Sequence, residues 1–370
     1  MLFFDEFPWI NTPKSGFLQA FEHFWNTWAS KQKNLIVVIC GSSASWMIQK
    51  VINNKGGLHN RVTRKIRLLP FSVAETEAYL RSRKIVLDRY QILQLYMAIG
   101  GIPHYLKEVE KGESVTQVID KLCFNKDGFL YNEFNNLYAA LFTNSDQHIA
   151  IIKALAARKN GLTRNEIMTI CRLTSGGSTS ILLDELTESG FISAQHAFGR
   201  NTKDALYKLI DEFSIFYLHF MAGKRIQGAG SWIRYAASPS WRSWSGIAFE
   251  SVCLKHTQEM KKGLGIGSVY SALTSWQYKG ATDEDGAQID LIIDRQDRCI
   301  NLCEIKFTAE PFEMNKKYAL ELEKKIKVFQ ARTGTKKTCF LTFVSTYGVK
   351  NSEKYPGIIQ NQLTMDYLFE

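Results

Sequence analysis

The sequence lacks the features that mark secreted and membrane proteins. Its seven cysteines have no paired spacing, which argues against a disulfide framework and indicates reduced thiols. The longest clean apolar run, residues 35–40, is far too short to span a bilayer. Asp5 and Glu6 stand where a secretion signal would be basic. We therefore expect a cytoplasmic protein that does not enter a membrane.

No segment of the chain concentrates charge of one sign. The formal net charge is +10, and this excess is spread along the chain rather than gathered in one tract. Such a balance permits a polyanionic partner such as nucleic acid, but it does not establish one. With 370 residues and 45% hydrophobic content, the chain is long enough for two or three domains that each bury a core.

We expect an α/β multidomain protein. Near-continuous apolar strands at 2–5, 35–40 and 65–69 fit a parallel sheet that is covered on both faces. A helical pattern follows, which a Gly-Gly-Ile-Pro break at 100–103 interrupts. A stretch rich in Gly, Ser and Ala at 223–240 is the best candidate for a linker. The expected division is 1–72, 73–145, 146–225, 241–347 and a tail at 348–370.

Residues 146–225 have the order that is typical of a winged helix-turn-helix. Thr163 and Glu166 form a capping box for the second helix. The third helix, 178–189, carries three acids and no Lys or Arg, so it would repel DNA phosphates. Arg200 and Lys203 in the hairpin could touch a DNA backbone without specifying a sequence. Two alternatives stay open: docking of a protein partner through this domain, and DNA contact through Arg200 and Lys203.

Three residues on two consecutive expected strands form a candidate chemical site. A turn at 294–298 would place Asp290 opposite Leu302, with Glu304 as its diagonal neighbour about 7–8 Å away on the same face. Two carboxylates at that reach can share a hard divalent ion. Lys306 points to the same face and could orient or activate the attacking water. A buried ion pair is the alternative explanation of this pattern.

The C-terminal segment resembles the PD-(D/E)xK nucleases. The resemblance rests on the order helix, strands, helix, strand and on the Asp-x13-Glu-x-Lys pattern of Asp290, Glu304 and Lys306. It implies metal-assisted phosphodiester hydrolysis of DNA, in which Mg²⁺ polarises the phosphate and lowers the pKa of bound water. Glu250, on the preceding helix, could add a further metal ligand.

The chain contains half of a nucleotide-binding pattern. No GxxxxGK[ST] loop, which cradles phosphates, occurs in it. Four segments nevertheless follow the order of a P-loop ATPase: an apolar strand ending in Asp5 and Glu6, Ser42 after the second strand, Arg61, and a Gly-Ile-Pro that ends at Pro103. Together they resemble the prokaryotic, archaeal-type AAA+/STAND ATPase family with a winged helix and a C-terminal nuclease-like domain.

The resemblance implies a role for each of these residues. Asp5 would hold the Mg²⁺ of bound ATP and Glu6 would polarise the attacking water. Ser42 would face the γ-phosphate, Arg61 matches an arginine of the family, and Pro103 lies in the lid that contacts the nucleotide. The implied fold is a partial P-loop ATPase sheet with a helical lid, a winged helix-turn-helix and a restriction-endonuclease-like α/β domain.

The missing loop limits what this resemblance implies for activity. Without its strand, the second and third expected strands would lose the neighbour between them. We expect that the chain is truncated at its N-terminus and that it neither binds ATP tightly nor hydrolyses it. The alternative function is a non-catalytic interaction or DNA-binding module with residual ATPase and nuclease sites.

Overall fold

The computed structural model describes most of the 370 residues. It leaves out residues 13, 43, 54–55, 143–144, 175, 197, 199–204, 225–227, 229, 237 and 281–285. The expected DNA contacts Arg200 and Lys203 therefore lie outside the described residues. Within the described part of the chain, no helix is both long and apolar enough to cross a bilayer.

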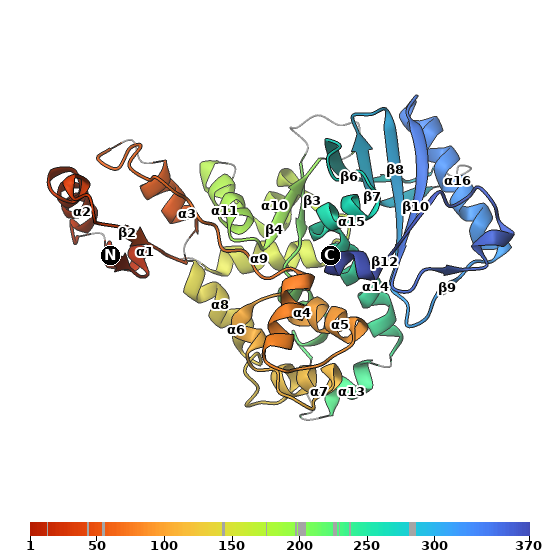
Figure 1. Cartoon of the computed structure of the whole chain (residues 1–370), viewed down its shortest axis with the longest axis horizontal. Helices are drawn as coiled ribbons and strands as arrows, with labels where there is room; N and C mark the ends of the chain where they lie inside the picture. The colour runs from red at the N-terminus through yellow and green to blue at the C-terminus, as the bar shows by residue number, and fades with distance from the viewer. Residues whose placement is uncertain are drawn as a thin grey trace.

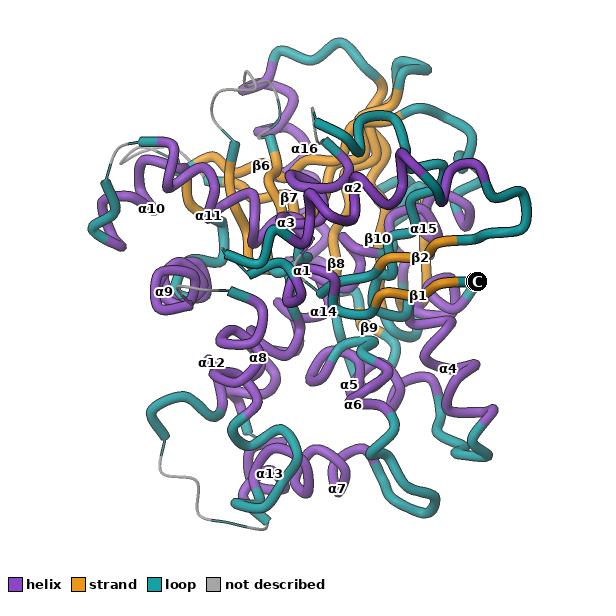
Figure 2. Tube along the Cα trace, turned by 90° about the vertical axis from the view of Figure 1, so that its left-hand side faces the viewer, coloured by secondary structure: helices purple, strands orange, loops and turns teal. Residues whose placement is uncertain are grey.

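The N-terminal unit is a two-stranded parallel sheet with its own small core. Leu2 of β1 pairs with Val37 of β2, and Figure 2 shows the two strands side by side. Phe21 of α2 packs against Phe7 of α1, and both belong to a small buried cluster with Val51. The elements of this unit are β1 (Leu2–Phe4), α1 (Phe7–Ile10), α2 (Phe17–Thr27), η1 (Ala29–Lys31), β2 (Val37–Ile39), α3 (Ala44–Met47) and η2 (Ile48–Ile52).

The third strand expected at 65–69 is absent, and that prediction was wrong. The stretch has no regular secondary structure, and Ile66, Leu68 and Leu69 are 73%, 91% and 65% exposed. An apolar run becomes a strand only where a neighbouring strand accepts its backbone hydrogen bonds. Here Arg67 instead donates to the carbonyl of Glu188, the last residue of helix α11 (Gly177–Glu188), at 2.5 Å.

A helical region follows and begins with well-capped helices. Ser72 and Glu75 form a capping box, and Asp88 caps the next helix. The Gly-Gly-Ile-Pro break has a steric cause, because a Cβ on Gly101 would lie 1.9 Å from the carbonyl oxygen of Phe71. The helices are α4 (Val73–Ser82), α5 (Arg89–Ile99), α6 (Pro103–Leu106), α7 (Val115–Ile119), η3 (Asp120–Phe124) and α8 (Glu133–Leu141).

The next segment, which we call the three-stranded unit, combines helices with an antiparallel sheet of strand order β3-β5-β4. The capping box predicted at Thr163 and Glu166 is confirmed. The acidic helix α11 contacts α3 of the N-terminal unit. The elements are α9 (Ser145–Ala156), β3 (Leu162–Thr163), α10 (Arg164–Cys171), α11 (Gly177–Glu188), β4 (Ile192–Gln195) and β5 (Leu206–Leu209).

The stretch interpreted as a linker contains a buried helix, so that interpretation was wrong in part. Helix α13 (Ser231–Ala236) inserts Trp232, which is 1% exposed, against aromatic rings of η3 and α12 (Glu212–Phe220). Asp120 accepts hydrogen bonds from the backbone N–H groups of Gly230 and Trp232, at 2.6 and 2.8 Å. The Gly and Ser content suggested flexibility, but one large aromatic ring anchors the segment.

The C-terminal part is built on a five-stranded mixed sheet of order β12-β10-β8-β7-β6. Helix α16 (Lys316–Thr333) packs on one face through Phe329. Helices α14 (Pro239–Lys255) and α15 (Thr257–Gly263) belong to the large core that includes the other face. The strands are β6 (Ser271–Tyr278), β7 (Ala287–Arg295), β8 (Cys299–Lys306), β10 (Thr338–Ser345) and β12 (Asn361–Thr364), with β9 (Phe312–Glu313) and β11 (Val349–Lys350) in a separate pair.

The expected tail is part of this sheet. Strand β12 pairs in parallel with β10, and the short helix η6 (Met365–Phe369) that follows packs on α4 and α15. Arg89 of α5 donates to Asp366 at 2.7 Å. The C-terminal residues are therefore bound to the helical region at α4 and α5.

One hydrophobic core joins the helical region, the three-stranded unit and α14, whereas the N-terminal unit has a separate core. His256 lies within the joined core. Its Nε2 accepts from the backbone N–H of Val73, and its Nδ1 donates to the carbonyl of Val252, at 3.0 and 2.8 Å. Figure 1 shows the N-terminal unit set apart at one end, with the five-stranded sheet at the other.

Candidate functional site

The β7–β8 hairpin brings Asp290 against Glu304, but with a different register from the predicted one. Leu302 pairs with Ile292 rather than with Asp290, and the pairing of β7 with β8 ends at Leu291 and Cys303, beside an irregularity in the pairing of β7 with β6. The cause is the turn, which closes over three residues with Arg298 at φ 65°. The backbone N–H of Ile305 donates to Asp290 Oδ2 at 3.1 Å.

Glu304 is buried and held by several donors. Its side chain is 2% exposed, and Lys306 and Lys325 each approach one of its oxygens at 2.8 Å. Tyr318 donates to the same carboxylate at 2.6 Å. Burial raises the pKa of Glu304, but the two lysines outweigh it and hold the pKa below its usual value. Glu304 is therefore an anion at neutral pH whose oxygens are already occupied.

Lys306 remains protonated in this arrangement. Burial lowers its pKa, but the adjacent Glu304 carboxylate more than compensates and raises the pKa above its usual value. Its side chain is one third exposed. A permanently charged ammonium group can stabilise a phosphate oxygen or orient a water, but it is a poor proton acceptor. Of the two roles considered from the sequence, the geometry favours orientation.

The carboxylate of Glu250 on α14 and that of Asp290 on β7 interact with each other. Burial and the charge of Asp290 raise the pKa of Glu250 to about 7, despite the ion pair that Lys159 makes with it at 3.0 Å. Burial and the charge of Glu304 likewise raise the pKa of Asp290. Buried like charges favour a proton or a cation between them. Glu250 and Asp290 are therefore placed where a proton or a cation would be bound favourably.

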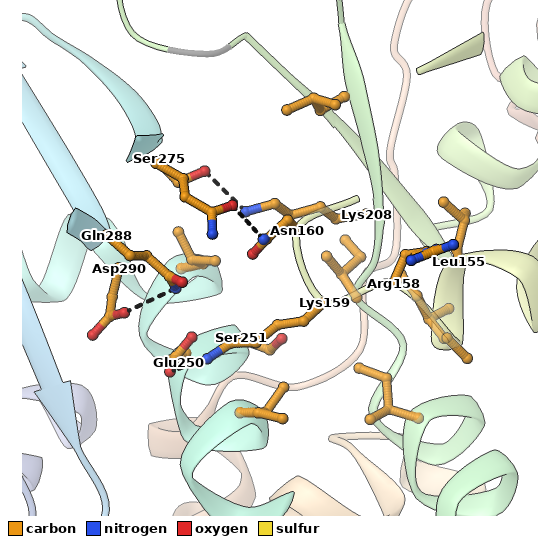
Figure 3. Close-up of a pocket in the computed structure, with 18 of the residues that line it drawn as sticks. Leu155, Arg158, Lys159, Asn160, Lys208, Glu250, Ser251, Ser275, Gln288 and Asp290 are labelled. Atoms are coloured by element: carbon orange, nitrogen blue, oxygen red, sulfur yellow. Dashed lines mark hydrogen bonds and ion pairs between the residues drawn. The ribbon is translucent and has the colours of Figure 1, made fainter. Parts of the chain in front are cut away.

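Asp290 and Glu250 line a cleft of about 740 Å³. The three-stranded unit forms the facing wall, as Figure 3 shows for Lys159, Asn160 and Lys208. Polar contacts join the walls: Lys208 donates to Ser275 of β6 at 3.0 Å, and Asn160 donates to Gln277 at 2.5 Å. These wall residues lie some 80 to 130 positions before Asp290, so no local pattern in the sequence connects them with it.

The carboxylates fit a Mg²⁺ site in part. In the described ranges, no group of three or more His, Cys, Asp or Glu side chains is arranged to hold a metal ion. Glu304, named as a ligand from the sequence, is engaged by its lysines. Asp290 and Glu250 remain as hard oxygen donors in one cleft. Mg²⁺ is commonly bound by one or two carboxylates together with water and substrate phosphates, so this pair is sufficient in chemical type.

The nucleotide-pattern residues of the N-terminal unit meet where β1 and β2 end. Glu6 accepts from the backbone N–H and the hydroxyl of Ser42, at 3.2 and 3.0 Å. Asp5 accepts from Cys40 at 2.8 Å. The carboxyl ends of parallel strands are where open α/β sheets bind ligands. The structure thus brings Asp5, Glu6 and Ser42 together.

Arg61 and Pro103 are not part of this group. Arg61 is exposed in the loop before the stretch at 65–69. Pro103 is exposed at the start of α6, and Figure 1 shows α6 inside the helical region, away from β1 and β2. The contact with a nucleotide that the resemblance implies for Pro103 would require these two parts to approach each other.

Comparisons with known proteins give weak likenesses. No family model matches the chain. An uncharacterized protein of Methanocaldococcus jannaschii, MJECL04, is 23% identical over 295 residues, which are 79% of this chain and 64% of that protein. The chain thus spans less than two thirds of that relative's length.

Two solved structures resemble the chain only loosely. The Walker-type ATPase PABY2304 of Pyrococcus abyssi aligns with a TM-score of 0.38 and 18% identity, over 58% of this chain and 62% of that one. Protein VC1899 from Vibrio cholerae aligns with a TM-score of 0.25 and 11% identity, over 96% and 86%. Both TM-scores are too low to assign a shared fold.

Proposed function

We propose that the C-terminal sheet and α14 form a Mg²⁺-dependent site of the PD-(D/E)xK type that hydrolyses phosphodiester bonds in DNA. The observation that carries this proposal is the β7–β8 pairing, which sets the Asp290 carboxylate against the strand that bears Glu304 and Lys306. The sheet order and the position of Glu250 on α14 support it.

Each side chain has a separate role in this proposal. Asp290 and Glu250 would hold the metal ion, which when bound supplies charge to polarise the phosphate and acidify water. Glu304 would act as a positioning residue, because its ion pair at 2.8 Å orients Lys306. Lys306, kept protonated, would orient the attacking water and stabilise negative charge on the phosphate. Lys159 offsets the charge of Glu250 until a cation arrives.

Residues 1–72 we propose to be part of an ATPase-like nucleotide-binding core. The convergence of Asp5, Glu6 and Ser42 at the ends of parallel strands supports this. The chain has no GxxxxGK[ST] loop to cradle the phosphates. ATP hydrolysis by this chain is therefore not part of the proposed activity.

The test is nicking of supercoiled plasmid by the purified chain. Nicking should require Mg²⁺, disappear in EDTA and disappear in Asp290→Ala. The matched control is Asp297→Ala in the adjoining turn, where the side chain is 39% exposed and pairs locally with Arg295; it should nick as the parent does. The same preparation should release no phosphate from ATP, and measurable release would contradict our view of residues 1–72. Nicking that survives Asp290→Ala would eliminate the assignment.

The alternative is a non-catalytic interaction or DNA-binding module. The neutralisation of Glu304 by Lys306 and Lys325, with a further donor from Tyr318, favours it, because such buried networks often serve specificity of folding. A parent chain that binds DNA but never nicks it with Mg²⁺ would favour this alternative. Its protein partner, if any, would dock on the three-stranded unit, whose acidic α11 already contacts α3 within the chain.

A further inference from the structure

The cleft beside Asp290 has the size of a site for a single small ligand. Its volume of about 740 Å³ falls in the range of roughly 300–1,000 Å³ that encloses such ligands. A sphere of that volume is about 11 Å across, which is less than the width of the B-DNA major groove alone, about 12 Å. The cleft therefore has room inside it for one nucleotide but not for the full width of a duplex.

Most of the lysine and arginine side chains that line this cleft come from the three-stranded unit. Lys208 on β5 is largely buried and donates to Ser275. In the described part of the chain Lys208 makes no ion pair, although the charges of Glu250 and Asp290 act on it. Burial of a charged ammonium group that no carboxylate pairs with costs free energy. Such a group is suited to an anionic ligand, and in this cleft that ligand would lie beside the two carboxylates.

Aromatic rings form another part of the wall. Trp276 and Tyr278 on β6 lie with their ring centroids 6.4 Å apart and their planes within 17°. The guanidinium of Arg332 lies 4.4 Å over the Tyr278 ring. All three residues line the cleft. Nucleobases stack on such faces, and each stacked base contributes about 1–3 kcal/mol in single-strand binding proteins.

We propose that the cleft takes one unpaired nucleotide, with its phosphate at Lys208 and its base against Trp276 or Tyr278. The favoured source is an unpaired stretch of a DNA strand, which negative supercoiling promotes in plasmid, because only an unpaired nucleotide offers a base face and a phosphate to the same small cavity. This inference rests on the proposed function, since Asp290 and Glu250 would then act on the phosphodiester bond next to that nucleotide.

Fluorescence anisotropy of the full chain in EDTA tests binding without cleavage. The probes are a short 5′-phosphorylated single strand and the blunt duplex of the same sequence, with a free mononucleotide as competitor. The single strand should bind about tenfold more tightly than the duplex. Lys208→Met should weaken single-strand binding by about tenfold or more, because a charged hydrogen bond to phosphate is lost. Lys126→Met, an exposed lysine of the helical region, is the matched control and should bind as the parent does.

The binding measurement and the nicking assay can fail independently of each other. Equal affinity for duplex and single strand would overturn the inference about the cleft, and this comparison needs no variant. Unchanged binding by a Lys208→Met chain whose melting temperature matches the parent's would also overturn it. Competition by the mononucleotide supports a free nucleotide as the source, and the absence of competition supports an unpaired stretch of a strand. Single-strand binding without Mg²⁺-dependent nicking contradicts only the proposed hydrolysis, whereas nicking without single-strand preference contradicts only the cleft.

Discussion

At the scale of single residues, the histidine at the end of α14 ties stability to pH. His256 is 3% exposed. One of its ring nitrogens accepts a hydrogen bond from a backbone N–H, and the other donates one to a backbone carbonyl. Only the neutral ring can do both. Burial lowers its pKa below the usual value, so protonation opposes the folded state.

The expected consequence is a loss of stability in acid. The unfolded ring gains its proton near pH 6.5, so the stability from His256 is complete above that pH. This contribution to stability is lost as the pH falls toward the pKa of His256 in the folded protein, at up to about 1.4 kcal/mol per pH unit. His256→Gln should therefore unfold more easily than the parent at pH 7.5, and the difference should narrow by pH 5.5. Urea unfolding at both pH values checks this, with exposed His23→Gln as the control; a constant difference would contradict it.

At the scale of elements, α13 shows how one side chain turns an apparent linker into core. Trp232 touches aromatic rings of η3, α12 and α14. Its neighbour Ile233 on the same short helix is 55% exposed. The two residues therefore form an internal comparison of buried and exposed apolar side chains in one helix.

Trp232→Ala should lower the free energy of unfolding by about 3–5 kcal/mol, because it leaves a cavity in the joined core. Ile233→Ala should change it by no more than about 0.5 kcal/mol. Denaturant unfolding of both variants is the measurement. A small effect of Trp232→Ala would mean that residues 231–236 act as a linker after all.

The sequence predicts elements well where one local signal decides them. Long apolar strands such as β8 and the capping box at Thr163 are of this kind. It fails where distant segments decide. The run at 65–69 has strand composition but no neighbouring strand, and Lys208 reaches the cleft only through the packing of β5 beside β6. The register of the hairpin depended on a positive φ at Arg298, which residue type does not indicate.

At the scale of the whole molecule, stability should be unequally shared. The N-terminal unit buries few residues, and Phe3 of its β1 is 57% exposed. By contrast, β8 lies between two strands, and most of its side chains are buried. Local opening is easiest where few apolar contacts resist it.

Native-state hydrogen exchange should therefore distinguish the two sheets. Amides of β1 and β2 should exchange about 100-fold or more faster than those of β8 and β10, since opening the small sheet costs less than global unfolding. Mass spectrometry of peptic fragments measures both in one experiment. Equal protection of the two sheets would show that the N-terminal unit shares the stability of the joined core.

The contact between η6 and the helical region has a consequence for biosynthesis. Arg89 and its partner Asp366 are 277 positions apart. A ribosome that adds about 5–20 residues per second needs roughly 15 to 55 s to cover that distance. During this interval α4 has emerged without η6, which packs on it. The contact between these two segments is therefore among the last to form during synthesis of the chain.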